Sequence, residues 1–413
     1  MKTGILGNGI SYAVKRGGKS VAWCALSVKC GTRDEGSFKS GTAHFAEHCV
    51  FKGTKRRTSS YINSYLDRLG GELNAFTTKE ETVFHATVLR EDLFKAMRLL
   101  FELVFEPVFP ERAVSLEKNV IIEEIKSYKD SPADDIYDKF EEILLSGHEL
   151  SRPILGKVST VAKIESAELL AFTNSRYLPE NICLTVVADE NEEVLSEKIQ
   201  KAMSSFPCPG KSANAVGKIW KRSSKPLTFN HFHKEINKRS HSANLVLGGL
   251  APGLFGGTER YAAILLGNVL AGPTSNSILN LALREKRGLV YDVETNYTQY
   301  GETGVMSVSL GCDKSNMEKC LQILDEELGK LMDNKLSDNK LRVAKRQLEG
   351  QLAISGENGE TQVLSMGKSL MSFGDILPSA EVKSRIEALS AEDLREAARK
   401  IFRTENRNIL IYN

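Results

Sequence analysis

Two histidines and a glutamate lie close together in the segment His44-Phe-Ala-Glu47-His48. If this segment is helical, positions i, i+3 and i+4 share one face, because an α-helix has 3.6 residues per turn. Two imidazoles in this arrangement can bind one zinc ion, and the carboxylate can take a proton from a water molecule that the metal acidifies. The order is the reverse of the common HExxH motif. A helix that merely exposes two histidines is the alternative.

A catalytic zinc site needs a third protein ligand and an open fourth position. Glu117 and Glu124 are seven residues apart and would share one helical face, whereas Glu123 is turned by about 100°. We predict Glu124 as the third ligand and Glu117 as an outer carboxylate that orients a histidine or the water. Val120 and Ile121 are expected to hold this helix against a core. A solvent-facing acidic helix is the alternative.

The elements that must position these residues follow from the hydrophobic pattern. Strands are expected at 20–31, as a pair within 71–89, and at 182–187, 242–249, 290–299, 304–311 and 408–412. Helices are expected at 40–53, 59–69, 90–104, 111–128, 260–270, 275–286, 315–332 and 337–355, with a helix break at 354–360.

The element order repeats after a segment rich in Pro, Gly, Ser and Lys, which indicates a linker at 206–230. An offset of 219 residues aligns Phe51-Lys-Gly-Thr54 with Leu270-Ala-Gly-Pro273 and places Ala263, Leu266 and Gly267 opposite the polar residues of the HxxEH segment. We therefore predict an α+β fold of two homologous domains, 1–205 and 231–413, each an antiparallel-rich sheet covered by helices. Only the first domain carries the chemistry.

Several segments together resemble the pitrilysin/insulinase family of metallopeptidases. They are the HxxEH segment with the following Phe51-Lys-Gly-Thr54, and Glu124, which lies 80 residues after His44 as the family's third ligand does. Residues 70–77 (GGELNAFT) resemble the family's GAxxNAxT strand, with Gly71 in place of Ala, and residues 147–156 match a further family segment. The resemblance spans essentially the whole chain. It is closest to the branch of mitochondrial processing peptidase and its short bacterial relatives.

This resemblance implies a zinc-dependent endopeptidase that hydrolyses unfolded peptides, with one Zn2+ per chain and with Glu47 as general base and later proton donor. It also implies that Arg284 and Tyr291, which match the family's Arg-x6-Tyr segment, reach towards the scissile carbonyl. A guanidinium and a phenol suit a developing oxyanion. The alternative is an exposed helix end followed by a strand in which Tyr291 packs.

Substrate and assembly are also implied by the resemblance. Asn74, Ala75 and Phe76 would belong to an edge strand to which an extended peptide adds by backbone hydrogen bonds. Family relatives enclose peptides between paired halves, so the two domains would form half of a clamshell chamber. A homodimer is expected, or a heterodimer with an inactive homologue. Whether Arg284 and Tyr291 act within one subunit or across a dimer stays open.

Composition excludes other classes of partner. The net charge is +2, and the short basic run at 52–57 is interpreted as a solvated loop, so no nucleic-acid partner is expected. Seven cysteines without a CxxC pair, and the lack of a signal-like or membrane-spanning apolar run, favour a cytoplasmic protein. A rival function is a non-catalytic structural or partner subunit of a processing complex, as some relatives are. A third is an enzyme that needs an inactive homologous chain.

Overall fold

The computed structural model describes residues 1–208, 227, 231–238 and 240–413. The chain forms two compact units: Met1–Lys126, Arg152–Ser223 and Ile354–Ile376 make the first, and Ser127–Ser151, Ser224–Ala353 and Leu377–Asn413 make the second. The units therefore differ from the predicted contiguous domains 1–205 and 231–413 in two segments. Residues 127–151 belong to the second unit, and residues 354–376 belong to the first. The predicted linker at 206–230 lies almost entirely outside the described residues.

The first unit is built on a six-stranded sheet with the order β1-β2-β6-β3-β5-β4. β2 and β6 are parallel, and the other neighbours are antiparallel. The strands are β1 Lys2–Ile5, β2 Ser11–Arg16, β3 Val21–Val28, β4 Glu72–Thr77, β5 Thr82–Leu89 and β6 Ile182–Ala188. β4 is the last strand of this sheet, so one of its sides has no neighbouring strand among the described residues.

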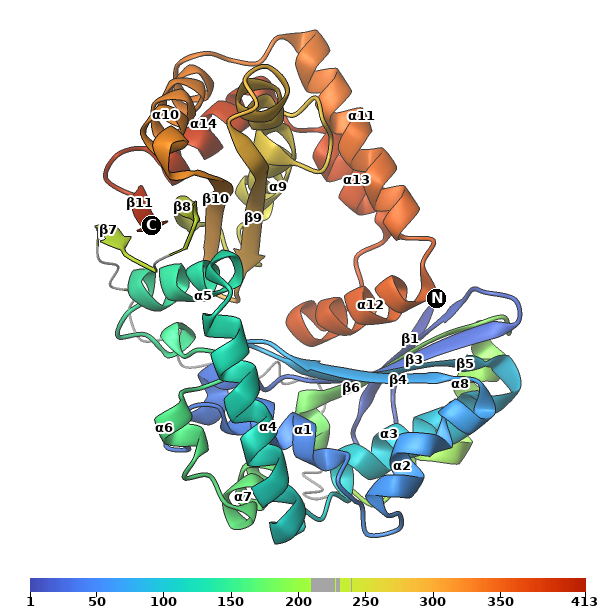
Figure 1. Ribbon diagram of the computed structural model, residues 1–413. Helices are drawn as coiled ribbons and strands as arrows, with labels where there is room; N and C mark the ends of the chain where they lie inside the picture. Colours follow the sequence, from blue (N-terminus) through green and yellow to red (C-terminus); the bar gives the residue numbers. More distant parts are fainter. Residues whose placement is uncertain (209–226, 228–230, 239) are drawn as a thin grey trace. The chain divides into compact units, whose positions relative to one another are not determined.

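Helices cover both faces of the first sheet (Figure 1). One face carries the larger core, which includes α1, α3, α4, α7 and α8, and the other face packs against α12 through Val363, Met366 and Leu370. The helices of this unit are α1 Thr42–Val50, α2 Ser59–Tyr65, α3 Leu93–Phe105, α4 Glu111–Lys129, α6 Val158–Val161, α7 Ser166–Arg176, α8 Glu192–Met203 and α12 Gly359–Phe373. α12 belongs to the C-terminal half of the sequence, yet it closes the core of the first sheet.

The second unit has a five-stranded sheet with the order β7-β11-β8-β10-β9. Its strands are β7 His233–Ile236, β8 Ser242–Ala251, β9 Val290–Gln299, β10 Gly304–Asp313 and β11 Asn408–Tyr412. Its helices are α5 Pro132–Leu144, α9 Gly257–Ala271, the π-helical η6 Asn280–Glu285, α10 Met317–Asp333, α11 Asp338–Ser355, α13 Ser379–Glu387 and α14 Ala391–Phe402. α9, α10 and α14 pack in one core, whereas α5 covers the other face through Ile136, Phe140 and Leu144.

The two units repeat one topology. β2-β6-β3-β5-β4 corresponds to β7-β11-β8-β10-β9, and in both sheets only the first of these pairs is parallel. α9 follows β8 as α1 follows β3. Ala263, Leu266 and Gly267 are buried in α9, where α1 carries its polar residues. The predicted α+β fold of two homologous domains is therefore confirmed, and the second copy holds apolar packing in place of the polar cluster.

Three local expectations differ from the structure. The predicted helix at 275–286 is mainly the six-residue η6, whose last turn is closed by Lys286 N donating to Leu281 O. Val120 is 53% exposed, because α4 turns Val114, Ile121 and Ile125, and in part Ile122, towards the core. The basic run at 52–57 is not simply solvated, since Arg57 donates to the buried Glu102. The strands β1, β2 and β7 and the helices α5 to α8 and α12 to α14 were not anticipated.

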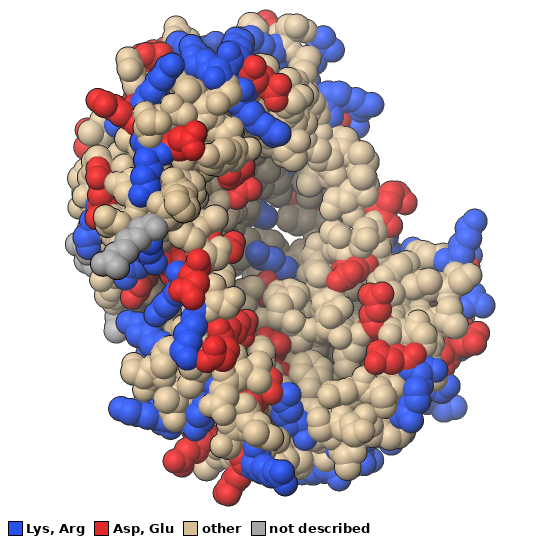
Figure 2. All heavy atoms as spheres, in the orientation of Figure 1, with Lys and Arg blue, Asp and Glu red and all other residues tan. Residues whose placement is uncertain are grey.

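Two observations concern the nucleic-acid and membrane partners that the sequence argues against. On the face shown in Figure 2, acidic and basic side chains are interspersed over both units. Among the described residues, no helix combines the length and the apolar character that crossing a membrane would require.

Candidate metal centre

The α1 helix presents the HxxEH residues on one face because its opposite face is apolar. Ala43, Phe45, Ala46, Cys49 and Val50 are fully buried in the first core. His44 and Glu47 are themselves largely buried, whereas the His48 side chain is 25% exposed. Burial raises the pKa of the Cys49 thiol to about 12, so this neighbour of His48 stays protonated and serves packing. The predicted helix and its polar face are confirmed.

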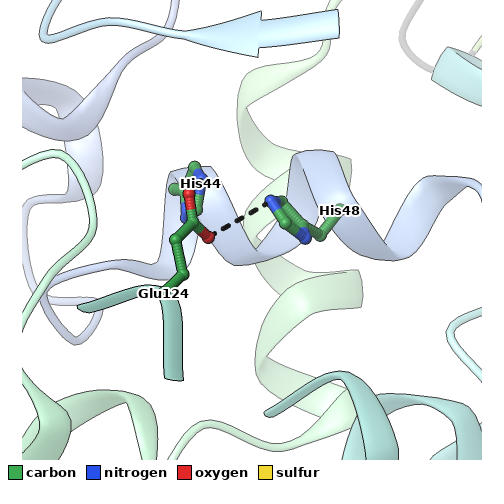
Figure 3. Close-up of side chains that lie close together, drawn as sticks. All are labelled: His44, His48 and Glu124. Atoms are coloured by element: carbon green, nitrogen blue, oxygen red, sulfur yellow. Dashed lines mark ion pairs between the residues drawn. The ribbon is translucent and has the colours of Figure 1, made fainter. Parts of the chain in front are cut away.

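The α4 helix brings a carboxylate to the two imidazoles (Figure 3). Glu124 Oε1 lies 3.8 Å from His44 Nε2, and Glu124 Oε2 lies 3.7 Å from His48 Nε2. One ligand atom from each of the three residues can be chosen so that all lie within 4.8 Å of one another. Glu123 points elsewhere: its side chain is 71% exposed and pairs with Lys126. The structure therefore brings together the three residues that were predicted as ligands.

The arrangement fits a divalent metal ion better than it fits hydrogen bonds. Both histidine–carboxylate distances exceed the usual N–H···O length of about 2.7–3.2 Å. Glu124 Oε2 is buried and has no hydrogen-bond partner among the described residues, a costly state for a carboxylate oxygen. Zinc bonds of about 2.0–2.2 Å would place tetrahedral ligand atoms about 3.3–3.6 Å apart. Small side-chain shifts would thus let these three residues hold a zinc ion.

The protonation state of His44 also suits ligation. Burial, followed by the neighbouring His48, lowers the pKa of His44 to about 3, so its imidazole is neutral at physiological pH. Metal ligation requires the neutral ring with a free lone pair. The two rings lie close together, with centroids 4.5 Å apart and planes at 59°. A protonated pair would be unfavourable at this separation, because like charges repel.

Glu117 has the outer position that was predicted for it. Its Oε1 lies 3.0 Å from His48 Nδ1, and its Oε2 accepts from Lys52 Nζ at 2.6 Å. Burial alone would raise the pKa of Glu117, but the hydrogen bonds from Lys52 and His48 outweigh it and hold the pKa below its ordinary value. Glu117 is therefore a carboxylate, and it orients one of the two histidines.

Glu47 is held beside the cluster by β4. Thr77 Oγ1 donates to Glu47 Oε2 at 3.1 Å, and Thr82 Oγ1 of β5 donates to Cys30 O at 2.9 Å. Burial raises the pKa of Glu47 above its ordinary value, opposed by His48 and by the hydrogen bond from Thr77. One carboxylate oxygen is thus fixed, and the other can accept a proton from a neighbouring molecule.

The N-terminus of α1 is anchored by the buried side chain of Glu35, which contacts the partly exposed Arg152. Glu35 Oε1 accepts hydrogen bonds from the backbone N–H groups of Gly41 at 2.9 Å and Ala43 at 3.1 Å. Arg152 lies 3.2 Å from Glu35 Oε2 and also donates to Gly36 O and Phe38 O. The free N–H groups and the dipole at a helix start favour a carboxylate there. This anchor sets where the ligand-bearing helix begins.

Stability should depend on pH through Glu35. Burial raises the pKa of Glu35 from 4.5 to about 7. Between these values the folded protein keeps a proton that the unfolded chain has released. The contribution of Glu35 is therefore fully present below pH 4.5 and is lost as pH rises through 7. Glu35→Gln cannot lose this proton, so its melting temperature should fall less over this window. Calorimetry of zinc-free wild type and variant checks this, and equal slopes would contradict it.

The predicted substrate strand is β4, and its place at the sheet edge is confirmed. Asn74 is exposed, and it lies opposite His85 in the register with β5. Ala75 packs towards the core that contains α1, whereas Phe76 packs towards α12. Successive residues alternate between the two faces of a strand, so Asn74 and Phe76 share the α12 face. A role in substrate binding stays a prediction.

Arg284 and Tyr291 belong to the second unit and are both exposed. Arg284 lies in η6. Tyr291 lies in the edge strand β9, where Gly311 pairs with Asp292 and Cys312 pairs with Val290. Tyr291 is therefore the extra residue of a bulge, a device that often redirects a side chain. Its hydroxyl donates to Asp313 Oδ1. Their catalytic role stays a prediction.

Four residues that support the centre were not singled out from the sequence: Glu35, Lys52, Thr77 and Arg152. Glu35 had a local signal, since it is an acidic residue shortly before a helix start. Thr77 was part of a quoted motif without an assigned role. Arg152 had no usable signal, because it is 117 residues away from Glu35 in the chain.

The chain matches two models of one protein family. Residues 13–158 match the model described as insulinase (peptidase family M16), and residues 163–348 match the model described as peptidase M16 inactive domain. All residues of the metal cluster lie within the first match. The inactive-domain description falls on the half in which α9 has apolar residues in place of the ligands.

Curated relatives and a solved structure are similar to this chain over most or all of its length. A Bacillus subtilis protein named as an uncharacterized zinc protease is 30% identical over 91% of this chain and 89% of its own length. A Rickettsia felis protein with a similar name is 29% identical over 91% and 89%. The crystal structure of a protease from Helicobacter pylori has the same fold, with a TM-score of 0.89 and 20% identity over 100% of this chain and 99% of that one. The chain therefore belongs to the insulinase family, peptidase family M16.

Proposed function

We propose that this protein is a zinc-dependent endopeptidase that hydrolyses unfolded peptides, with Glu47 as general base. The observation that carries the proposal is the convergence of His44, His48 and Glu124 around a buried carboxylate oxygen without a hydrogen-bond partner among the described residues. A peptidase role is supported at the level of the family, whose relatives are named zinc proteases. These two lines of support are independent, since one is geometric and the other rests on sequence.

The donor set decides which group the site would hold. Two imidazole nitrogens and one carboxylate are typical of catalytic zinc, which keeps a further position open. Bound there, zinc would supply a Lewis acid that polarises a peptide carbonyl and acidifies a water molecule. Glu117 and Lys52 keep the His48 ring oriented, and the Glu35–Arg152 pair keeps α1 in place.

Glu47 would move the protons. Thr77 holds its Oε2, so its Oε1 can accept a proton from the attacking water and later give it to the leaving amine. A buried carboxylate is a stronger base than an exposed one, because burial disfavours the charged form. The edge strand β4 would bind the peptide backbone by strand addition, and Thr77, which contacts Glu47, is the last residue of that strand.

The remaining roles extend the same proposal. Arg284 and Tyr291 would donate hydrogen bonds to the carbonyl oxygen as charge develops on it. The working assembly would be a homodimer, and a heterodimer with an inactive homologue is the other assembly to consider. Sedimentation at several protein concentrations distinguishes a dimer from a single chain.

Removal of the metal tests the proposal. Wild-type protein is assayed with an unstructured, internally quenched peptide and with a folded protein that carries the same sequence. It is assayed as purified, after chelation and desalting, and after addition of one equivalent of zinc. We expect cleavage of the unstructured peptide only, loss of cleavage without metal, and recovery with about one zinc per chain.

The outcomes separate the rival functions. Full zinc occupancy without hydrolysis of any peptide would favour the non-catalytic subunit or an enzyme that lacks its partner. Cleavage that persists in metal-free protein would show that the reaction does not need the metal. Cleavage of the folded substrate at an equal rate would contradict the restriction to unfolded peptides.

A further inference from the structure

We infer that Lys52 is a positioning residue of the metal centre, which acts through Glu117 to select the tautomer of His48 that can bind metal. The role of Lys52 in metal binding rests on the proposed function, whereas the contacts from which it is inferred do not depend on that function. Lys52 lies in the basic run that was interpreted as a solvated loop, and its side chain is only 25% exposed. Its ammonium group is directed at the cluster and not into bulk solvent.

Three groups form a chain of hydrogen bonds that ends at the metal site. Lys52 Nζ is 2.6 Å from Glu117 Oε2, Glu117 Oε1 is 3.0 Å from His48 Nδ1, and the Glu117 side chain is 12% exposed. An ammonium group can only donate, so Glu117 Oε2 must accept. Lys52 also fixes the rotation of the carboxylate, because one oxygen is tied while the other faces the ring.

The polarity of this chain determines where the His48 proton lies. With both Glu117 oxygens acting as acceptors, Nδ1 carries the hydrogen and Nε2 keeps its lone pair. Nε2 faces Glu124 Oε2 at 3.7 Å, so an acceptor faces an acceptor and a cation between them satisfies both. The opposite tautomer would place a hydrogen in that space and block ligation.

His44 lacks such support, which increases the importance of Lys52. Within the described residues, His44 Nδ1 is buried without a hydrogen-bond partner. One of the two imidazole ligands is therefore oriented by packing alone, and the other by Glu117 and Lys52. Loss of Lys52 leaves Glu117 free to rotate away from His48 Nδ1, so the hydrogen bond that selects the His48 tautomer is weakened.

The test compares Lys52→Met with Lys52→Arg and with Lys55→Met. Lys55 is exposed in the same loop, so its variant removes an equal charge from the same segment without touching Glu117. Nitrogen-15 NMR of histidine-labelled, zinc-free protein reports the tautomer, with His48→Gln used for assignment. Zinc affinity is measured by competition with a chromophoric chelator. Neither readout depends on peptide hydrolysis.

We expect Lys52→Met to populate the Nε2–H tautomer of His48 and to weaken zinc binding by about 10–100-fold, the usual effect of losing an outer partner. Lys52→Arg should retain most of the wild-type behaviour, and Lys55→Met all of it. An unchanged tautomer or an unchanged affinity in Lys52→Met overturns the inference, as does a wild-type His48 that is not protonated at Nδ1. If Lys52→Met does not fold, Lys52→Gln, which also lacks the ammonium group, takes its place: a shifted tautomer supports the inference and a wild-type tautomer overturns it. Failure of peptide cleavage with the tautomer shift intact would reject only the proposed function.

Discussion

Glu47→Gln is expected to lower peptide hydrolysis by about 10²–10⁴-fold while zinc stays bound. Gln has the shape of Glu, and its side-chain oxygen can still accept the hydrogen bond from Thr77. It cannot take a proton from water, so the base is lost and the surrounding packing is kept. The three ligands are untouched, and zinc content should stay near one per chain. The test measures the initial rate of cleavage of a quenched peptide and the zinc content of the same sample.

The matched control is Glu123→Gln, which removes an exposed carboxylate of α4 that pairs only with Lys126 in the described structure. It should cleave at the wild-type rate. An unchanged rate in zinc-loaded Glu47→Gln would mean that another group accepts the proton. Loss of zinc together with activity would instead assign Glu47 to the binding of the metal.

Glu124→Gln is expected to weaken zinc binding by more than about 100-fold, beyond the effect of losing an outer partner. A neutral amide is a poorer ligand than a carboxylate and removes the negative charge from the cluster. The two histidines of α1 alone leave the metal with two protein ligands, fewer than a catalytic site normally has. Chelator competition gives the affinity, and hydrolysis should fall with zinc occupancy.

Glu123→Gln is again the control, because it changes the neighbouring residue on the same helix. Wild-type zinc affinity in Glu124→Gln would reject Glu124 as the ligand. Glu117 would then be the candidate, since it contacts His48. That assignment would require Glu117 to leave Lys52, so the two results together identify the third ligand.

The residues of the metal centre could be picked out from their spacing along the chain. Residues i, i+3 and i+4 of a helix share a face wherever the helix lies, and so do residues seven apart. His44, Glu47 and His48 could therefore be grouped without any structure, as could Glu117 and Glu124. The match of the two halves in element order was sufficient to predict two homologous α+β domains. Joining the two helices into one site needed the family resemblance, because spacing along the chain does not give distance in space.

The surroundings of the metal centre depend on contacts between segments that are far apart in the chain. Periodicity shows that a helix has an apolar face but not which sheet covers it, so the assignment of α5 to the second sheet and α12 to the first was not predictable. Val120 fits an apolar pattern, yet it is 53% exposed. The contact between Glu35 and Arg152 joins segments 117 residues apart. Lys52 has the sequence context of a surface lysine and becomes part of the site only because α4 places Glu117 beside it.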